Sequence, residues 1–309
     1  MARLGYIQVV RTCNQHCRFC SNPENDRELS FDDARALADK FKRDGYDGVI
    51  LTGGEPTLYE PLPDLIRYAN ATGLACRIIT NGQRTADPAY LDSLLDAGLR
   101  HLHLSIHTHK PRLQALLTGN RDSLANLIRT LHRARSLPLR IDINQTICRH
   151  NADHLADTAR WIVERFPRVR HFSYNFLDPR QNRVAEHPDV IPRLKDCQAS
   201  LLAAMRFLDE SGRTFRIDLY PPCLLGDYAF AATETRALVK GEARTVEFLD
   251  ERGSLPTNLW FFAKALKCRS CSLGPICVGV RDLDSVYSSD DLEPQQRDPS
   301  PIVARILSE

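Results

Sequence analysis

Six short apolar runs rich in β-branched residues alternate with longer amphipathic runs between residues 5 and 175. This alternation predicts repeated strand–helix units around a parallel sheet, closed or partly closed as a barrel. Loops at the carboxyl ends of such strands share one face, where a functional site is expected. The predicted strands are YIQVVR, DGVILT, ACRIIT, LRHLHLSI, LRIDINQ and VRHFSYNF, and the predicted helices lie near 32–44, 62–72, 88–97, 122–135, 152–166 and 191–211.

The strand–helix rhythm stops near residue 212, which divides the chain into three predicted parts. Residues 1–212 form the barrel-like domain. The segment TFRIDLYPPC could add one more strand, but a polar stretch and a second group of cysteines follow it, so residues 213–287 are expected to form a separate small module. Residues 288–309 begin with SSDDLEPQQRDPSP, a composition that predicts a poorly ordered tail.

Composition excludes several classes of protein. The net charge of +2 gives no electrostatic signal for a nucleic acid or a membrane surface. The first residues are too short an apolar stretch for a signal peptide, and eighteen apolar residues never run together, so a cytoplasmic location is expected. Ten cysteines are too few for a disulfide scaffold, and clustered thiols in a reducing compartment favour metal ligation.

Three of those cysteines, Cys13, Cys17 and Cys20, follow the first predicted strand within one short loop. Three thiolates could bind three irons of a four-iron cluster and leave the fourth iron open to a small molecule. They could also be part of a zinc site or remain free thiols.

A second motif, LTGGEP, places Gly53, Gly54, Glu55 and Pro56 directly after the second predicted strand. Paired glycines allow the backbone to approach a ligand closely, and a carboxylate at a strand end can accept charge-assisted hydrogen bonds from an ammonium group. Taken alone, the same residues could form an ordinary turn.

Together these motifs resemble the radical S-adenosylmethionine (radical SAM) superfamily. The resemblance lies in the Cys13-x3-Cys17-x2-Cys20 spacing with Phe19 before the last cysteine, and in Gly53–Pro56. It implies a partial (β/α)6 TIM-type barrel, a 4Fe-4S cluster on the three cysteines, and SAM bound to the open iron. Gly53–Pro56 would bind the SAM amino group and Phe19 would belong to the cofactor site. From 5 to 175 the chain is similar to the branch containing molybdenum-cofactor and quinone-cofactor biosynthetic enzymes.

Weaker matches to the family occur at other predicted strand ends. Thr80 lies in a TNG turn, and Ser105 and Asn144 occupy positions whose side chains often contact SAM in the family. Each is as well explained as a structural cap. His107 and His109 are not assigned a catalytic role. No catalytic acid or base is predicted.

A second group of cysteines, Cys268, Cys271 and Cys277, is preceded by the isolated Cys223. The group resembles the C-terminal Twitch module of the same branch, which implies a second, auxiliary 4Fe-4S cluster with these four residues as ligands. A zinc site with four thiolates uses similar spacings. An auxiliary iron left open for substrate, without Cys223, is the other alternative. The remaining cysteines, Cys76, Cys148 and Cys197, are expected in the core.

The resemblance implies an enzyme that cleaves SAM reductively to a 5′-deoxyadenosyl radical and abstracts hydrogen from a substrate. The pathway would be biosynthetic, or one of cofactor or peptide maturation. The expected partners are a small-molecule or peptide substrate and an electron donor such as flavodoxin or ferredoxin. The cysteine motif begins at residue 13, which leaves no room for a leader-binding domain and favours a small molecule or a peptide delivered by a partner.

Two regions are expected to shape the substrate pocket. The first is the segment 176–192, in which Arg180 and Arg183 are available for an anionic group, and the second is 226–262. The alternative function is a zinc-stabilised module that binds nucleic acid or protein without catalysis, which the balanced charge disfavours.

Overall fold

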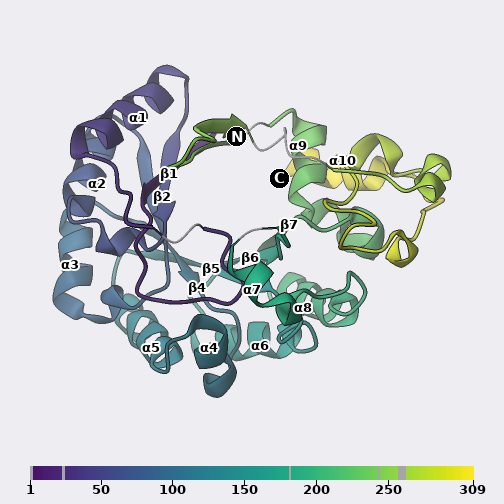
Figure 1. Ribbon diagram of the computed structural model, residues 1–309, viewed down its shortest axis with the longest axis horizontal. Helices are drawn as coiled ribbons and strands as arrows, with labels where there is room; N and C mark the ends of the chain where they lie inside the picture. Colours follow the sequence, from purple (N-terminus) through teal and green to yellow (C-terminus); the bar gives the residue numbers. More distant parts are fainter. Residues whose placement is uncertain (1–2, 23–24, 181, 243, 257–261) are drawn as a thin grey trace.

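The structure is a computed structural model that describes residues 3–22, 25–180, 182–242, 244–256 and 262–309. Figure 1 shows a curled, open sheet with helices on its outer face. The strand order is β7-β6-β5-β4-β3-β2-β1-β8-β9, and only the last pair is antiparallel. The strands are β1 (Leu4–Val10), β2 (Gly48–Gly53), β3 (Ala75–Thr80), β4 (His101–Ser105), β5 (Arg140–Ile147), β6 (His171–Phe176), β7 (Thr214–Asp218), β8 (Thr245–Glu247) and β9 (Ser254–Pro256).

The helices confirm the six strand–helix units, with three differences. Two short helices, one between β4 and the next long helix and one after β6, were not predicted, and the last helix of the barrel begins later than residue 191. The helices are α1 (Phe31–Arg43), α2 (Leu62–Ala71), α3 (Pro88–Asp96), α4 (Pro111–Thr118), α5 (Ser123–Ala134), α6 (Leu155–Arg165), α7 (Arg183–Glu186), α8 (Gln198–Glu210), α9 (Thr233–Lys240) and α10 (Ser300–Ser308).

Local sequence signals explain where these helices begin. The Ser30 hydroxyl accepts a hydrogen bond from the Asp33 amide and caps α1, whose first turn carries acidic residues and whose last turn is basic. Asp87 caps α3 in the same way, with Pro88 at its first position. These caps satisfy amide groups that the helices themselves leave unpaired.

The core lies between the outer face of the sheet and the helices. Leu102 and Leu104 of β4 are fully buried in the same apolar cluster as Leu127 and Leu131 of α5. The residues between them on β4, such as His103, face the interior of the half-barrel. Because side chains alternate along a strand, one face of the sheet is apolar and the other lines a polar interior.

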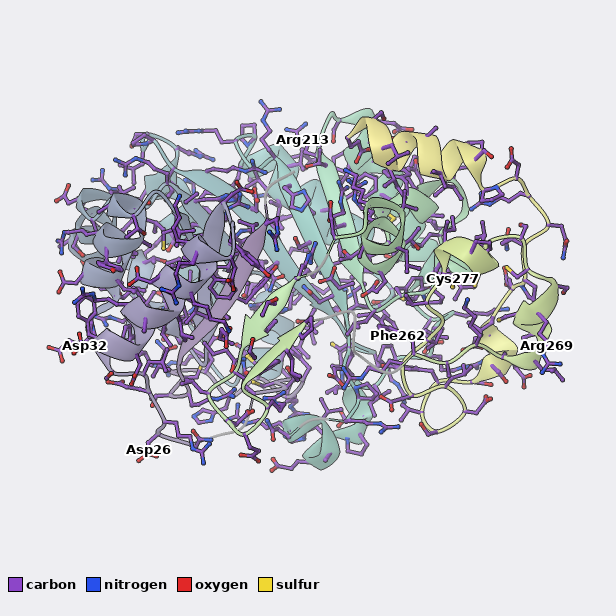
Figure 2. The ribbon with its side chains drawn as sticks, turned by 90° about the horizontal axis from the view of Figure 1, so that it is seen from above. Asp26, Asp32, Arg213, Phe262, Arg269 and Cys277 are labelled. Atoms are coloured by element: carbon purple, nitrogen blue, oxygen red, sulfur yellow. The ribbon has the colours of Figure 1, made fainter. Side chains whose placement is uncertain are left out.

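The structure differs from the predicted division at residue 212. β7 pairs with β6 at one edge of the sheet, and β8 pairs with β1 at the other edge. Both strands come from the segment 213–287, so part of the expected separate module belongs to the barrel sheet. The remainder carries the second cysteine group in a lobe beside the barrel, where Figure 2 labels Cys277 and Arg269.

The end of the chain also differs from the expectation of a poorly ordered tail. Residues 300–308 form α10, in which Ile302 and Ile306 are buried against the core. Arg216 and Arg236 both donate to the Glu309 carboxylate, at 3.0 Å each. The apolar stripe of this short helix outweighs the polar composition that precedes it.

Glu234, at the start of α9, gives the fold a predicted pH dependence. Its Oε1 accepts a hydrogen bond from the Leu219 amide at 2.9 Å. Burial and the negative charge of Asp218 raise the pKa of Glu234 to about 7. Since this value lies above the unfolded value of roughly 4.3, the folded state favours the proton. The contribution to stability is complete below that unfolded value and is lost as pH rises through 7.

We therefore expect Glu234→Gln to melt at a higher temperature than the wild type at pH 8, with no difference at about pH 4. The two curves should diverge by up to about 1 kcal/mol per pH unit through the transition. Thermal denaturation measured from about pH 4 to about pH 8 tests this. The exposed Glu210 provides the control, since Glu210→Gln should leave the pH dependence unchanged. Parallel curves for the wild type and Glu234→Gln would show that the Glu234 carboxyl does not titrate near 7.

Candidate functional site

The loop after β1 brings Cys13, Cys17 and Cys20 together at the carboxyl ends of the strands. The Cys17 thiol interacts electrostatically with both other thiols, and the Cys20 amide donates to the Cys17 carbonyl at 3.0 Å. All three cysteines are half-buried and none is in a disulfide. The three predicted ligands therefore lie close enough for each of the other two thiols to raise the pKa of Cys17.

The surroundings of these thiols resist ionisation. Burial raises the pKa of Cys13 to about 11, and burial together with the neighbouring thiols raises the pKa of Cys17 well above its usual range. A cation is therefore needed to hold these groups as thiolates, which is the role of a metal centre.

Gly53 and Gly54, at the end of β2, have a structural role in addition to the predicted one. They pack against the backbone that leads into the cysteine loop. The Gly54 amide donates to the Val10 carbonyl at 2.6 Å, and the Glu55 amide donates to the Thr12 carbonyl at 2.9 Å. A Cβ atom on Gly54 would lie 2.1 Å from the Arg11 carbonyl oxygen. The glycines are required here by the approach of two backbone segments.

The Glu55 carboxylate is fully engaged with the protein. Its oxygens accept hydrogen bonds from the Thr57 amide at 3.1 Å, the Thr57 hydroxyl at 2.7 Å, the Thr80 hydroxyl at 2.6 Å and the Asn81 amide at 2.7 Å. Asn81 in turn donates to Asn14 of the cysteine loop at 2.7 Å. Glu55 therefore ties the ends of β2 and β3 to the cysteine loop, and Pro56 follows it, buried, in a short 3-10 helix.

Of the other predicted cofactor residues, Thr80 donates to Glu55, Ser105 and Asn144 are neighbours on β4 and β5, and Phe19 lies in a separate apolar cluster. Phe19 is buried in a small apolar cluster, with its ring 4.5 Å from that of His107 in an edge-on contact. Ser105 is half-buried beside Asn144 in the β4–β5 register. Asn144 lines the interior cavity and accepts a hydrogen bond from Asn175 at 2.6 Å. Burial lowers the pKa of His107 to about 3, in keeping with a structural role.

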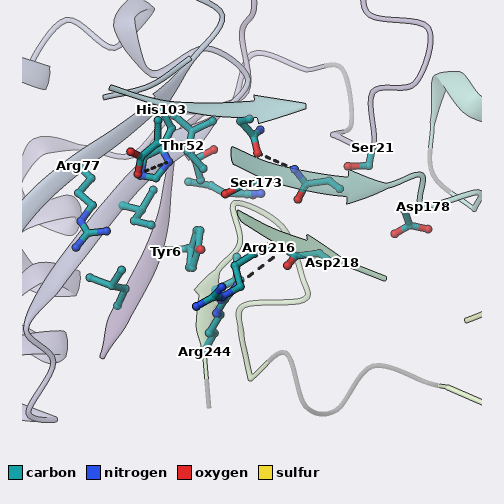
Figure 3. Close-up of a pocket in the computed structure, with 18 of the residues that line it drawn as sticks. Tyr6, Ser21, Thr52, Arg77, His103, Ser173, Asp178, Arg216, Asp218 and Arg244 are labelled. Carbon is teal, nitrogen blue, oxygen red and sulfur yellow. Dashed lines mark hydrogen bonds and ion pairs between the residues drawn. The ribbon is translucent and has the colours of Figure 1, made fainter. Parts of the chain in front are cut away.

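A cavity of about 1050 Å³ fills the interior of the half-barrel. Ser21 and Asn22 of the cysteine loop reach into it, and the remaining lining comes from the inward faces of the strands and from the C-terminal segment (Figure 3). Asn22 also donates to the Gly53 carbonyl at 2.6 Å. The cysteine loop, the glycine turn and the cavity are therefore contiguous.

A polar cluster on the cavity wall was not predicted. Asp142 Oδ2 lies 2.6 Å from His101 Nε2, and Arg140 donates to Asp142 Oδ1 at 3.1 Å. Although burial opposes it, the hydrogen bond and charge of His101 hold the pKa of Asp142 below its usual range. Burial and the charge of His101 lower the pKa of His103 to about 3. At neutral pH the cluster therefore pairs a carboxylate with a neutral His103.

The signal for this cluster is present in the sequence. The strands RIDINQ, HFSYNF and TFRID alternate polar and apolar residues, whereas a parallel strand covered on both faces is almost continuously apolar. The alternation indicates that the inner face lines a polar cavity.

The second cysteine group also comes together. Cys223, Cys268, Cys271 and Cys277 surround one small pocket, and the Cys223 thiol interacts electrostatically with the other three. The Gln295 amide donates to Cys271 Sγ and the Gly279 amide to Cys277 Sγ, both at 3.3 Å. Cys76, Cys148 and Cys197 are buried, as predicted.

The two arginines proposed for an anionic group do not line the cavity. Arg180 forms an ion pair with Asp282, and Arg183 lies 3.1 Å from His16 Nδ1 beside the cysteine loop. Of the predicted pocket segments, Asp178 and residues 244–255 contribute lining groups. Residues 181, 243 and 257–261 lie outside the described part of the chain.

This fold and cysteine arrangement define a recognised class. The sequence profile of the Radical SAM superfamily matches residues 7–162. The chain belongs to the radical SAM superfamily.

Within it, the chain is similar to PqqA peptide cyclases. It is 31% identical over 226 residues to the enzyme of Xanthomonas campestris pv. campestris strain B100, covering 70% of this chain and 58% of the relative. It is 27% identical over 208 residues to the PqqA peptide cyclase of Rhodopseudomonas palustris, covering 64% of this chain and 54% of that relative. The chain thus spans just over half the length of these relatives.

Solved structures share the fold. Streptococcus suis SuiB bound to the precursor peptide SuiA superposes with a TM-score of 0.67 at 16% identity, covering 90% of this chain and 72% of SuiB. Native anSMEcpe with bound AdoMet gives 0.64 at 14% identity, covering 99% of this chain and 95% of that protein. They confirm the α/β partial barrel. Within the described residues, no helix has the length and apolar character needed to cross a bilayer.

Proposed function

We propose that this chain is a radical SAM enzyme that modifies a peptide in a biosynthetic or maturation pathway. The observation that carries the proposal is the convergence of Cys13, Cys17 and Cys20 at one end of a large polar cavity. Superfamily membership implies a 4Fe-4S cluster and SAM. When bound, the cluster and SAM together supply an electron and a 5′-deoxyadenosyl radical for hydrogen abstraction.

The donor set fits a four-iron cluster better than one zinc ion. Four thiolates around zinc lie about 3.8 Å apart, given Zn–S bonds of about 2.3 Å in a tetrahedron. Within the described residues, the sole group of three candidate ligands closer than 4.8 Å is His101, His103 and Asp142, so neither cysteine group is that compact. This observation disfavours the zinc-stabilised binding module.

The chain's own residues position and shield the centre. Cys13, Cys17 and Cys20 would hold three irons. Glu55 and Asn81 fix the loop that carries these cysteines, and Phe19 packs behind it. We assign SAM contacts to the backbone of Gly53–Pro56 and to Asn144, and a weaker role to Thr80 and Ser105, whose side chains lie outside the cavity lining.

The C-terminal lobe would hold an auxiliary 4Fe-4S cluster on Cys223, Cys268, Cys271 and Cys277. Their common pocket and the amide donors to two of the sulfurs support this assignment. The lobe would be the Twitch-like module, without β7 and β8. Electrons would come from a donor such as flavodoxin or ferredoxin in the cytoplasm.

The peptide substrate is supported by the relatives. PqqA peptide cyclases act on a peptide by name, and SuiB was solved with its precursor peptide. A cavity of about 1050 Å³ exceeds the volume of most small-ligand sites, which leaves room for several residues of a peptide beside SAM.

The test is the formation of 5′-deoxyadenosine. Protein reconstituted anaerobically with iron and sulfide, then given dithionite and SAM, should produce it, as measured by mass spectrometry. Deuterium should pass into deoxyadenosine from the labelled peptide substrate. Iron-loaded protein that never forms deoxyadenosine would refute the proposal, and zinc without iron would support the binding module.

A further inference from the structure

We propose that the cavity contains a carboxylate-binding site made by Arg77, Tyr6 and Arg244, which anchors an acidic group of the substrate away from the cysteine loop. The inference rests on the proposed function only in calling the bound molecule a substrate. No catalytic role is assigned to these residues; they position the molecule.

The argument starts from the charges that line the cavity. Six arginines and four acidic residues face it. Five of the arginines have an acidic partner within ion-pair distance: Arg140 with Asp142, Arg216 with Glu309, Arg244 with Asp218, Arg252 with Asp250 and Arg281 with Asp178. The remaining arginine is Arg77, so the lining carries one positive charge without a partner among the described residues.

Arg77 is half-buried on β3 and has no hydrogen bond or ion pair to any described residue. Burial and the charge of Arg140 lower its pKa, while Asp142 opposes this from beyond ion-pair distance. Asp142 is already engaged by His101 and Arg140. A partly desolvated guanidinium left in this state is a site that an anion would complete.

Two further groups turn this single charge into a pocket. Tyr6 of β1 lines the cavity together with Arg77 and Arg244. Figure 3 shows its side chain between those of the two arginines. Arg244 is 36% exposed on its side chain, and the carboxylates of Asp218, at 3.9 Å, and of Glu234 and Glu242 act on it electrostatically. No hydrogen bond from Arg244 to a described side chain uses its donors. Two guanidinium groups and a phenol hydroxyl therefore converge on one part of the cavity.

The chemistry favours a carboxylate. A guanidinium binds a carboxylate through two parallel hydrogen bonds, and the tyrosine hydroxyl can donate a third. Arg77 is the one arginine of the lining without an acidic partner among the described residues, and a single carboxylate would supply that partner. Phosphate can also accept two hydrogen bonds from a guanidinium, so inorganic phosphate is the competing anion in the test.

The position of this site gives it a function. Figure 3 places Arg77 and Arg244 at one end of the cavity and Ser21 and Asp178 at the other. Ser21 follows Cys20, so the opposite end adjoins the predicted cluster. A substrate held by its carboxylate at Arg77 would extend toward the cysteine loop, which orients its reacting part.

The test uses the reconstituted protein and small probes at matched ionic strength. Butyrate, which has one carboxylate, is the carboxylate probe, butyramide its neutral analogue, and inorganic phosphate the competing anion. Dissociation constants come from ligand-observed NMR. We expect butyrate to bind the wild type, and Arg77→Gln to weaken this binding about tenfold or more, as expected for the loss of a charge-assisted pair. The affinity of Arg77→Lys should lie between those of the wild type and Arg77→Gln, because lysine keeps the charge but loses the paired N–H donors of the guanidinium.

A second readout is independent of any ligand. Since Arg77 is a cation without a partner among the described residues, its removal should not destabilise the fold. We expect the melting temperature of Arg77→Gln to be about 1–3 °C above that of the wild type. Arg43→Gln is the matched control, an exposed arginine on α1 that should alter neither binding nor melting.

The outcomes separate this inference from the proposed function, because carboxylate binding is measured without SAM cleavage. Butyrate binding that is unchanged in Arg77→Gln, or equal binding of butyramide or phosphate, would overturn the carboxylate site. Acetylglutamate methylamide then identifies the source: tighter binding than butyrate indicates an acidic peptide side chain, and weaker binding indicates a free acid.

Discussion

Alanine at Cys17 is expected to abolish 5′-deoxyadenosine formation. Cys17 lies between the other two thiols of its loop and interacts electrostatically with both. Without it, a cluster would be held by two protein ligands, and neither a stable cluster nor a defined open iron should persist. We expect about four fewer irons per chain and a fall in deoxyadenosine of about 1,000-fold or more. The measurements are iron and sulfide content, low-temperature EPR of the reduced protein, and mass spectrometry of the product.

Two variants control for the loss of a thiol elsewhere. Cys76→Ala removes a buried core thiol, so it should cost stability and leave the iron content unchanged. Cys268→Ala should remove the proposed auxiliary cluster while leaving the EPR signal of the cluster in the cysteine loop. Deoxyadenosine formation by Cys17→Ala at the wild-type rate would show that the N-terminal cysteines are not the SAM-cleaving centre.

The parts of this protein that sequence reasoning predicted are those carried by local patterns. Each barrel strand is a short apolar run, and the cysteine motif occupies one loop, so both are visible within a few residues. The segment β8 is only three residues long and its partner β1 is more than two hundred positions away. No local pattern reports such a pairing, so residues 213–287 seemed separate. Likewise α10 is a single amphipathic helix that follows a polar stretch, so the composition of the whole segment predicted disorder.

The cavity shows the same limit at the level of side chains. Arg77, Tyr6 and Arg244 come from three places in the chain, and only the curled sheet brings them together. Arg77 lacks a partner among the described residues, whereas every other arginine in the lining has one. No sequence motif encodes this difference. The alternation of polar and apolar residues in β5, β6 and β7 indicates a polar interior, but it does not give the net charge of that interior.

The role of Gly53 and Gly54 illustrates how a motif can be located correctly and explained incompletely. Their predicted benefit was close approach to a ligand. In the structure they approach the backbone of residues 10–12, and Glu55 completes a hydrogen-bonded connection to β3 and the cysteine loop. The motif therefore shapes the loop that holds the cysteines, whatever contacts its backbone makes to SAM.

Gly54→Ala tests this role directly. The added Cβ would lie 2.1 Å from the Arg11 carbonyl oxygen and 2.3 Å from that of Thr12, both backbone atoms that cannot rotate away. The two segments must separate, which breaks the amide hydrogen bonds to Val10 and Thr12. We expect a loss of about 3 kcal/mol or more in stability, with iron content and deoxyadenosine formation both falling about 100-fold or to background.

A control variant separates steric conflict from backbone strain. Gly241 has a φ of +64° with nothing within 4 Å of an added Cβ, so Gly241→Ala introduces strain without a clash. It should cost about 1 kcal/mol, as left-handed backbone does for a residue with a side chain, and leave the iron content unchanged. Gly54→Ala protein that keeps its full iron content but binds SAM weakly would show that Gly54 acts on SAM itself. Gly54 has no left-handed φ, so backbone strain does not penalise alanine there. If Gly54→Ala lowers stability more than Gly241→Ala does, the cause is the contact of the added Cβ with residues 10–12.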